Sequence, residues 1–331
     1  MANDLPLQQS IEELRSFFEE KIQLTEFTNQ PERLYEPIHY IMQLGGKRVR
    51  PVCTLAAAEL FGKSPGDAIN QAIAVEVFHN FTLVHDDIMD EAPLRRGHST
   101  VHKKWDENTG ILSGDAMMIL AYQYLSKNAG TRLDVLFSNF SRTALQVCEG
   151  QQYDMNFEQK PTVSLVEYLG MIELKTAVLL GESLRLGATI AGASDIDLDL
   201  IFEFGKNFGI AFQLQDDILD LYGDPEKFGK QVGGDVMACK KTYLFAKAHA
   251  IANESQKSEL VDIYNNTNIE NAEKIKQVKA IFDNLDIRNR AKADMNTFYV
   301  SAGIALNSIS VEDSRKKILK NFAESLMVRE L

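Results

Sequence analysis

Two short acidic clusters contain the side chains of this sequence that are best suited to chemistry. The segment LVHDDIMDEAPLRRG, Leu83–Gly97, places Asp86 and Asp90 four positions apart. The segment FQLQDDILD repeats that spacing with Asp216 and Asp220. Residues four apart lie on one face of a helix, where two carboxylates repel each other. A Mg²⁺ ion relieves this repulsion, since one or two carboxylates and substrate phosphates commonly bind it.

Two simpler explanations and two other metals compete with this hypothesis. The acids could form a solvated helix end, or they could pair with the arginines that follow them in the sequence. Duplication of the pattern within apolar helices favours a bound cation over either explanation. Calcium in an EF-hand requires a DxDxDG run ending in Glu, which this sequence lacks. Zinc is poorly supported, because His85 stands beside the first cluster without a set of His and Cys at ligand spacing.

Basic residues recur near both clusters, although the chain has a formal net charge of -12. They occur in the segment GGKRVRP, directly after the first cluster, within a predicted helix, and in the glycine-rich segment GKQVGGD after the second cluster. These residues are Lys47, Arg48, Arg50, Arg95, Arg96, Lys175 and Lys230. Cations gathered near paired carboxylates indicate that phosphate oxygens are held between them.

The composition excludes several classes of protein. A hydrophobic share of 45% with 25% charged residues is typical of a globular protein with a sizeable core. The acidic balance argues against a nucleic-acid or anionic-membrane surface, which needs a basic footprint. No run of about 18 apolar residues is long enough to span a membrane. The beginning, MANDLPLQQSIEEL, lacks the basic and apolar regions of a secretory signal, so we expect a cytoplasmic protein.

The elements that position these residues are predicted to be helices. Apolar side chains before the first cluster recur in steps of three and four, the helical period. They are Ile73, Val77, Phe81, Val84 and Ile88. The pattern predicts one long helix with Asp67 as its N-cap and Pro93 at its end. It also predicts helices over 166–192, over 198–224 and from residue 294 to the end, and a surface helix pair within 253–277.

The chain is predicted to form one all-α domain over residues 1–331. No linker rich in Pro, Ser or Gly divides it, and no Asn-Gly or Asp-Gly hairpin flanked by alternating residues indicates strands. Pro51 is expected to open a helix after the segment GGKRVRP. The two acidic clusters begin similar segments about 130 positions apart, too far for a solenoid repeat. We expect two helices to bring their equivalent ends together.

These motifs together resemble the trans-prenyltransferases, or polyprenyl diphosphate synthases, of the short-chain type. The resemblance covers Leu34–Lys241 and rests on five segments that occur in the family's order and at similar spacing. They are GGKRVRP, LVHDDIMDEAPLRRG, the pair Lys175-Thr176, FQLQDDILD and GKQVGGD. The resemblance implies an all-α fold of long antiparallel helices around a deep central cavity. It also implies a homodimer, with the two aspartate motifs facing each other across the cavity mouth.

The resemblance further implies a role for each site residue. Asp86 and Asp90 would hold two Mg²⁺ ions and Asp216 a third, with neighbouring carboxylates from Asp87, Asp217 and Asp220. The diphosphate of an allylic substrate would be held by these metals and by the side chains of Arg95, Lys175, Thr176, Gln213, Lys230 and Lys240. The diphosphate of isopentenyl diphosphate would be held by Lys47, Arg50, His79 and Arg96.

The implied reaction is the head-to-tail (1'-4) joining of these two substrates. Metal ions and fixed cations stabilise negative charge on the leaving diphosphate of the allylic substrate. The double bond of isopentenyl diphosphate attacks the allylic cation, and a proton is lost to the departed diphosphate. This chemistry needs no protein nucleophile, but water must be excluded because it quenches the cation.

Product length is expected to depend on bulky residues upstream of the first motif, which form the cavity floor in the family. Phe81 is five residues before Asp86, Thr82 is four and Phe78 is eight. At 1.5 Å per residue, Phe81 sets a floor roughly 7 to 8 Å below the aspartate, which favours short products. One aromatic beside a small threonine favours geranylgeranyl over farnesyl diphosphate. On an ideal helix, however, Thr82 and His79 share the aspartate face more closely than Phe81 does.

Two other functions are compatible with part of the same set of motifs. A class I terpene cyclase has a similar fold and a first DDxxD. Its second motif normally follows a different pattern, and GGKRVRP would have no role in it. A non-catalytic subunit of a prenyl synthase usually loses one aspartate motif, whereas both are intact here.

Overall fold

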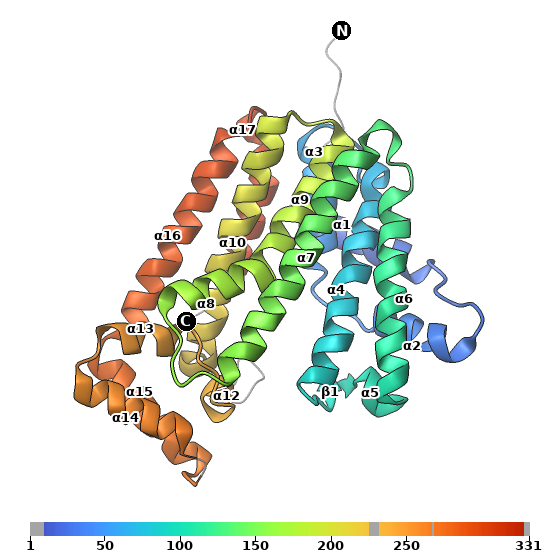
Figure 1. The fold of residues 1–331 in the computed structure, drawn as a ribbon. Coiled ribbons are helices and arrows are strands. Elements are labelled where there is room, and N and C mark those ends of the chain that lie inside the picture. Colours follow the sequence, from blue (N-terminus) through green and yellow to red (C-terminus); the bar gives the residue numbers. More distant parts are fainter. Residues whose placement is uncertain (1–9, 225–231, 267, 328–331) are drawn as a thin grey trace. The chain divides into compact units, whose positions relative to one another are not determined.

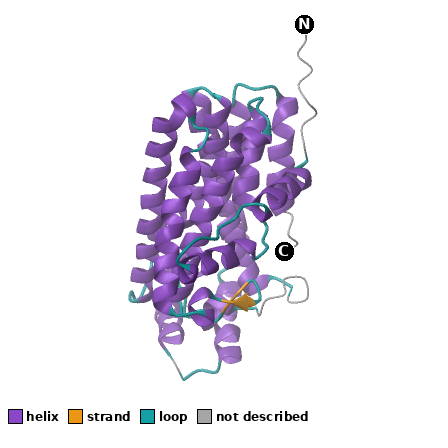
Figure 2. Ribbon diagram, turned by 90° about the vertical axis from the view of Figure 1, so that its right-hand side faces the viewer, coloured by secondary structure: helices purple, strands orange, loops and turns teal. Residues whose placement is uncertain are grey.

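Helices form almost all the regular structure of the computed structural model, which describes residues 10–224, 232–266 and 268–327 (Figure 2). This confirms the predicted all-α class. Lys230, a predicted ligand of the allylic diphosphate, lies outside the described residues. No helix within the described ranges is both long enough and apolar enough to cross a membrane.

Contacts along the chain define two compact units, each built from three separate segments. The first comprises 1–141, 182–201 and 310–319. The second comprises 142–181, 202–309 and 320–331. The two units interleave in sequence, so no single boundary separates them. One domain over residues 1–331 stays a prediction.

The first unit contains the segment GGKRVRP and the first acidic cluster. Its elements are α1 (Ile11–Gln23), α2 (Glu32–Gln43), α3 (Val49–Leu60), the 3-10 turn η1 (Pro65–Ala68), α4 (Ile69–Met89), the strands β1 (Leu94–Arg95) and β2 (His98–Ser99), α5 (Val101–Lys104), α6 (Glu107–Ser126) and the 3-10 turn η2 (Gly130–Arg132). Four helices contribute residues to both units: α7 (Leu133–Glu158), α9 (Val178–Ala191), α10 (Asp195–Tyr222) and α17 (Asp313–Met327).

Two predicted helix starts were wrong by a few residues. Asp67 does not cap α4, because the 3-10 turn η1 precedes that helix and Ser64 caps the turn. The Ser64 hydroxyl accepts a hydrogen bond from the Gly66 N–H, and the Asp67 carboxylate accepts one from the Ser64 N–H. Helix α3 begins at Val49, so Pro51 lies within its first turn, where a missing N–H costs little.

A small hairpin forms where only a loop was expected. Strands β1 and β2 pair antiparallel, with Leu94 opposite Ser99 and Arg95 opposite His98. Both turn residues have positive φ, 54° at Arg96 and 79° at Gly97, as in a type I′ turn. The sequence signal was missed because the turn uses Arg-Gly instead of the usual Asn-Gly or Asp-Gly. The hairpin fixes the direction of Arg95 and Arg96 beyond the end of α4.

Helix α4 is held against α6, which lies beside it in Figure 1. The close approach depends on Gly114 of α6. A Cβ at that position would lie 2.2 Å from Nε2 of His85, which itself lies 3.1 Å from the carbonyl oxygen of Ile111. The packing therefore fixes the rotation of α4 just before its aspartates.

The second unit contains the second acidic cluster and Lys175. Its other elements are α8 (Leu165–Ile172), the π turn η3 (Glu173–Ala177), α12 (Gly234–Met237), α13 (Tyr243–Ile251), α14 (Glu254–Asn265), α15 (Asn271–Asn284) and α16 (Ile287–Ser308). The surface pair α14 and α15 confirms that prediction. The helix expected from residue 294 onward is interrupted after Ser308 and resumes at Asp313. Buried side chains of α8, α10 and α13 to α16 form the core of the second unit.

Candidate functional site

The site residues fall into two groups, one in each unit. We call them the α4 site, which comprises the first acidic cluster with Lys47, Arg50, His79, Arg95 and Arg96, and the α10 site, which comprises the second acidic cluster with Lys175, Thr176, Gln213 and Lys240. The expected opposition of the two motifs involves both units and stays a prediction. Each group is described by itself.

The acidic residues of the α4 site lie at the C-terminal end of α4. Asp86 and Asp87 belong to its last turn, and Asp90 caps the helix with its N–H donating to the Asp86 carbonyl at 2.8 Å. Asp87 is buried, Asp86 is half-buried and Asp90 is exposed. A helix C-terminus carries partial negative charge, so these acids add to a negative field instead of offsetting one. A cation at this helix end is therefore favoured.

Arg95 pairs with the acids that precede it. Its Nε donates to Asp87 Oδ1 at 2.9 Å, its Nη2 contacts the same oxygen, and Nη2 lies 3.6 Å from Asp86 Oδ2. Burial raises the pKa of Asp87, while the Arg95 guanidinium opposes that rise. The simpler explanation of a local ion pair, set aside at the level of sequence, thus holds for Arg95 and Asp87.

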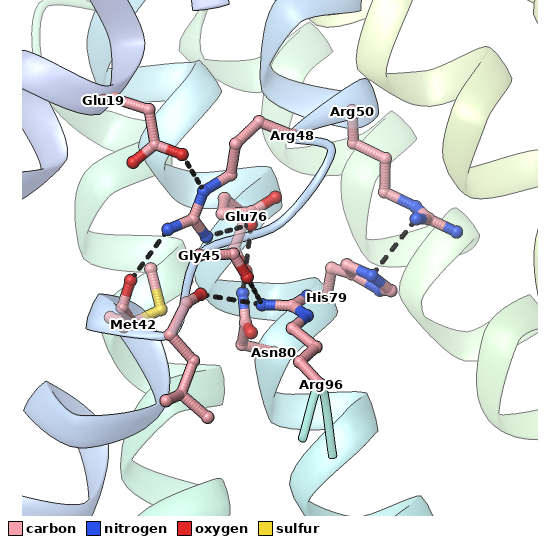
Figure 3. Close-up of polar contacts among 10 residues, drawn as sticks. Glu19, Met42, Gly45, Arg48, Arg50, Glu76, His79, Asn80 and Arg96 are labelled. Carbon is pink, nitrogen blue, oxygen red and sulfur yellow. Dashed lines mark hydrogen bonds and ion pairs between the residues drawn. The ribbon is translucent and has the colours of Figure 1, made fainter. Parts of the chain in front are cut away.

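A cluster of cations lies further back along α4, around His79. The Nη1 of Arg50 lies 3.2 Å from His79 Nε2, and Arg96 donates to the carbonyls of Leu44 and Gly45, each at 2.9 Å (Figure 3). Burial and the neighbouring guanidinium groups lower the pKa of His79 well below its ordinary value. A neutral His79 accepts a hydrogen bond from Arg50, since arginine only donates.

The same physical causes act on the two arginines of this cluster. Burial lowers the pKa of both Arg50 and Arg96; Glu76 opposes this, and neighbouring guanidinium groups lower it further. Like charges held close together repel each other unless an anion joins them. The cluster is therefore suited to a multiply charged anion such as a diphosphate. Lys47 is exposed at the edge of this cluster, on the loop before α3.

The residues expected to set product length lie one and two turns before Asp86. Phe81 is 7% exposed, and its ring contacts Phe78 and His85 with centroids 5.4 and 4.9 Å away. Phe78 in turn contacts Phe140 of α7 at 5.3 Å. The Thr82 hydroxyl donates to the His79 carbonyl at 2.8 Å. Phe81 therefore belongs to an aromatic cluster inside the first unit.

The α10 site surrounds a pocket of about 480 Å³ in the second unit. Among the predicted residues its lining includes Lys175, Thr176, Gln213, Asp217 and Lys240. Asp216 is half-buried on the same turn of α10 as Asp217. The pocket joins acidic and basic groups over a partly apolar wall, as a site for a phosphorylated apolar molecule requires.

Asp217 is the most constrained acid of this pocket. Its Oδ2 accepts hydrogen bonds from the Tyr168 hydroxyl and, at 3.1 Å, from the Tyr243 N–H, while Oδ1 accepts one from Gln213 at 3.0 Å. Burial raises its pKa to about 7, with hydrogen bonds opposing that rise. Gln213 and Asp217 thus restrain each other's side chains in this structure. The partners Tyr168 and Tyr243 are far away in sequence and carried no motif that reveals them.

Lys175 lies in the π turn η3, between α8 and α9. Its Nζ donates to Asp154 Oδ2 at 2.6 Å, and both side chains line the pocket. Gly150 of α7 permits the turn to lie this close, since a Cβ there would be 2.3 Å from the Lys175 nitrogen. π turns inside helices are frequent at functional sites. Asp154 was missed because it lies outside the five sequence motifs.

Asp220 organises the turn that follows the second cluster. Its Oδ2 accepts from the Asp235 N–H at 3.0 Å, and its carbonyl accepts from the Gly233 N–H at 2.6 Å. Gly233 has a φ of 79°, which favours glycine. Gly233 and Asp235 are thereby tied back to α10. Lys240 is exposed just beyond α12.

The carboxylates of the two motifs are candidate ligands for a metal ion. Within the described ranges, no three side chains of His, Cys, Asp or Glu are grouped as a metal site. Mg²⁺ commonly takes only one or two protein carboxylates and completes its octahedron with water and phosphate. The half-buried Asp86 and Asp216 and the exposed Asp90 provide the hard oxygen donors that such an ion prefers.

Comparisons with known proteins agree with the resemblance found in the sequence. The polyprenyl synthetase family model matches residues 31–282. A geranylgeranyl diphosphate synthase of Sulfolobus acidocaldarius is 37% identical over 302 residues, which are 88% of this chain and 89% of that protein. A geranylfarnesyl diphosphate synthase of Natronomonas pharaonis is 36% identical over 256 residues, 72% of this chain and 75% of that protein. A crystal structure of a geranylgeranyl pyrophosphate synthase has a TM-score of 0.91 and 46% identity, covering 98% of this chain and 100% of that chain.

Proposed function

The chain belongs to the polyprenyl synthetase family and is a prenyltransferase with the isoprenoid synthase fold, and from this premise we propose its reaction. It condenses isopentenyl diphosphate with an allylic diphosphate, head to tail (1'-4) and with Mg²⁺, into an all-trans prenyl diphosphate of the C15 to C20 range. The observation that carries this proposal is the cluster of Arg50 from α3 and Arg96 from the hairpin turn around His79 of α4, the helix whose C-terminal end carries Asp86 and Asp90. One diphosphate can bind these cations directly, and a second can bind through metal ions held by the aspartates.

The two diphosphates are assigned by the charge that each group offers. The cationic cluster of Arg50, His79 and Arg96, with Lys47, binds isopentenyl diphosphate through direct charge-assisted hydrogen bonds. The allylic diphosphate binds where carboxylates and cations meet. In the α4 site Arg95 contributes to it, and in the α10 site the contributors are Lys175, Thr176, Gln213 and Lys240. Lys230 belongs to the same proposal, although it lies outside the described residues.

Three Mg²⁺ ions are proposed, two held by Asp86 and Asp90 and one by Asp216. The donor set fits, because carboxylates are hard oxygen donors and Asp86 and Asp216 are only half-buried while Asp90 is exposed. When bound, the ions supply Lewis-acid stabilisation of negative charge on the leaving diphosphate. The chain's own residues do the rest. Arg95 and Lys175 hold the leaving group, and the neutral His79 orients Arg50 without adding charge. Buried Asp87 and Asp217 hold Arg95 and Gln213 in place.

Geranylgeranyl diphosphate is the product we favour over farnesyl diphosphate. The aromatic cluster of Phe78, Phe81 and Phe140 supports a closed floor behind the first motif. The smaller Thr82 supports room for one more isoprene unit than a second aromatic would leave. Relatives are named for both C20 and longer C25 products, so family membership alone does not fix the length.

A homodimer is part of the proposal. Leu112, Ile119 and Phe137 are each more than half exposed on α6 and the beginning of α7. A groove of about 490 Å³ lies among these helices, lined by Ile119, Leu133 and Phe137. Large apolar side chains grouped on a surface mark an interaction site. The proposed partner that covers this groove is a second copy of this chain, related by a two-fold axis as in most homodimers.

The proposed reaction is tested with purified protein, Mg²⁺, labelled isopentenyl diphosphate and, separately, C5, C10 and C15 allylic diphosphates. Products are dephosphorylated and chromatographed. We expect linear C20 alcohol as the main product, with C15 alcohol as the lesser alternative. Cyclic hydrocarbons would identify a terpene cyclase instead. No condensation with any primer would favour a non-catalytic subunit and overturn the proposal.

A further inference from the structure

Arg48 is the cation of the segment GGKRVRP to which the proposed function gives no role. Its side chain is 1% exposed, deeper than either of its basic neighbours. Its φ of 47° lies in the left-handed region, which a residue without glycine's freedom adopts at some cost. Arg48 is also the N-cap residue of α3, yet its side chain makes no capping hydrogen bond. Some other interaction must hold this conformation.

Three groups from three different elements hold the Arg48 guanidinium. Nε donates to Glu19 of α1 at 2.8 Å, and Nη1 donates to Glu76 of α4 at 2.6 Å. Nη2 donates to the carbonyl of Met42, at the end of α2, at 3.0 Å (Figure 3). Burial alone lowers the pKa of Arg48, but the two carboxylates reverse this and raise it. The guanidinium therefore stays charged and ties α1, α2 and α4 to the loop.

Glu76 is itself fixed in place. It is 2% exposed, and the Asn80 side chain donates to its carbonyl at 2.8 Å and to its carboxylate at 3.3 Å. Glu76 and Asn80 flank His79 on α4. The ion pair with Arg48 therefore joins the loop before α3 to the stretch of α4 that carries the histidine of the cationic cluster.

Arg48, the N-cap of α3, and Arg50, in its first turn, point in different directions. Figure 3 shows the Arg48 side chain directed toward Glu19 and Glu76, while Arg50 is directed toward His79. All three kinds of nitrogen on Arg48 are occupied by protein oxygens. Protein groups thus hold the Arg48 guanidinium, and Arg50 is the arginine of this segment that would face a ligand.

A second clamp holds the other end of the loop. Arg96 donates to the carbonyls of Leu44 and Gly45, and a Cβ on Gly46 would lie 3.1 Å from the Arg96 guanidinium carbon. The loop from Leu44 to Arg48 is therefore fixed by one arginine at each end. Lys47 lies between the two clamped positions.

We propose that Arg48 is a positioning residue, which fixes the loop so that Lys47 and Arg50 meet the diphosphate of isopentenyl diphosphate. This inference rests on the proposed function. The buried ion pair with Glu76 is suited to such a role, because its contribution is a defined geometry more than net stability. Misplacing a binding group by about 1 Å can cost roughly a hundredfold in rate.

The test measures binding of isopentenyl diphosphate to the full chain by calorimetry in EDTA, where the metal-dependent site does not contribute. Arg48→Lys keeps the charge but loses the planar fork that reaches three oxygens at once. We expect its Kd for isopentenyl diphosphate to rise roughly tenfold to a hundredfold. Binding of farnesyl diphosphate with Mg²⁺ should stay as in the wild type.

Arg185→Lys is the matched control. Arg185 is also a buried arginine of the first unit, paired with Glu182 within α9, and it is remote in sequence from the loop. We expect it to lower the melting temperature without changing either Kd. If Arg48→Lys does not fold, Glu19→Gln decides, because Glu19 is partly exposed and the substitution removes the negative charge of only one of the Arg48 partners. It should weaken binding of isopentenyl diphosphate in the same direction, by a smaller factor.

Three results would overturn the positioning role. One is an unchanged Kd for isopentenyl diphosphate in folded Arg48→Lys, or in Glu19→Gln where that variant decides. Another is an equal loss for both substrates, and the third is the same loss in Arg185→Lys. A wild-type chain that does not bind isopentenyl diphosphate at all would instead remove the proposed function, and with it this role.

Discussion

At the scale of single residues, partners far away in sequence decide what each side chain does. Arg95 is expected to bind a phosphate, and in this structure its guanidinium also pairs with Asp87 of the helix before it. His79 could have been an ordinary buried histidine, yet it lies beside Arg50, and burial together with the neighbouring guanidinium ions lowers its pKa and keeps it neutral. Residue types and spacing indicated that carboxylates and basic side chains make up both sites. They did not specify which oxygen each nitrogen meets.

Phe81→Ala should lengthen the product. Removal of the ring opens the floor one turn before Asp86 and breaks the contacts with Phe78 and His85. Chromatography of the dephosphorylated alcohols should reveal C25 or longer chains at the expense of C20. Phe18→Ala, which removes a fully buried ring of α1, serves as the control and should leave the product unchanged. An unaltered product from Phe81→Ala would show that the floor lies elsewhere.

At the scale of elements, the long helices followed from apolar periodicity, and the irregular parts did not. The helix over α4 was predicted to within a few residues, whereas the hairpin of β1 and β2 was missed because Arg96-Gly97 is an uncommon turn pair. The π turn at Lys175 was unforeseeable for another reason. It is shaped by Gly150, a glycine of a different helix that approaches the turn only in the folded protein.

Gly150→Ala should impair the enzyme through this turn. The new methyl would overlap the Lys175 backbone, so α7 or the turn must shift and the contact between Lys175 and Asp154 must change. We expect a loss of about 1 to 3 kcal/mol in the free energy of unfolding and a higher KM for the allylic substrate. Gly170→Ala is the control, because nothing lies within 4 Å of its Cβ in α8. There the same change should raise stability by up to about 1 kcal/mol. Equal effects of the two substitutions on KM would contradict this account.

At the scale of the whole molecule, the order of the motifs was sufficient to indicate the family and the all-α class. Five short segments in sequence order carried that inference, and the family model spans residues 31–282. The sequence could not show that each aspartate motif is embedded in its own set of contacts. Asp217, for example, depends on Tyr168 and Tyr243, residues 49 and 26 positions away. Such pairs arise from tertiary packing and leave no local pattern.

Ile119→Asp should dissociate the proposed homodimer. The substitution places a charge on the apolar groove of α6 and α7, where a partner would have to bury it without compensation. Light scattering after size exclusion should give twice the chain mass of 37.2 kDa for the wild type and a single chain mass for the variant. Val166→Asp is the control, since Val166 is 82% exposed on α8, and it should remain dimeric. A wild-type protein of single chain mass would contradict the dimer.

We propose that both aspartate motifs act on one allylic diphosphate. The most direct test compares the Mg²⁺-dependent condensation rate of the wild type with those of Asp86→Ala and Asp216→Ala. Binding of isopentenyl diphosphate in EDTA is measured alongside. We expect each variant to lose turnover by roughly two orders of magnitude or more. Each should retain its fold and its binding of isopentenyl diphosphate in EDTA. A near-normal rate in either variant would contradict this proposal.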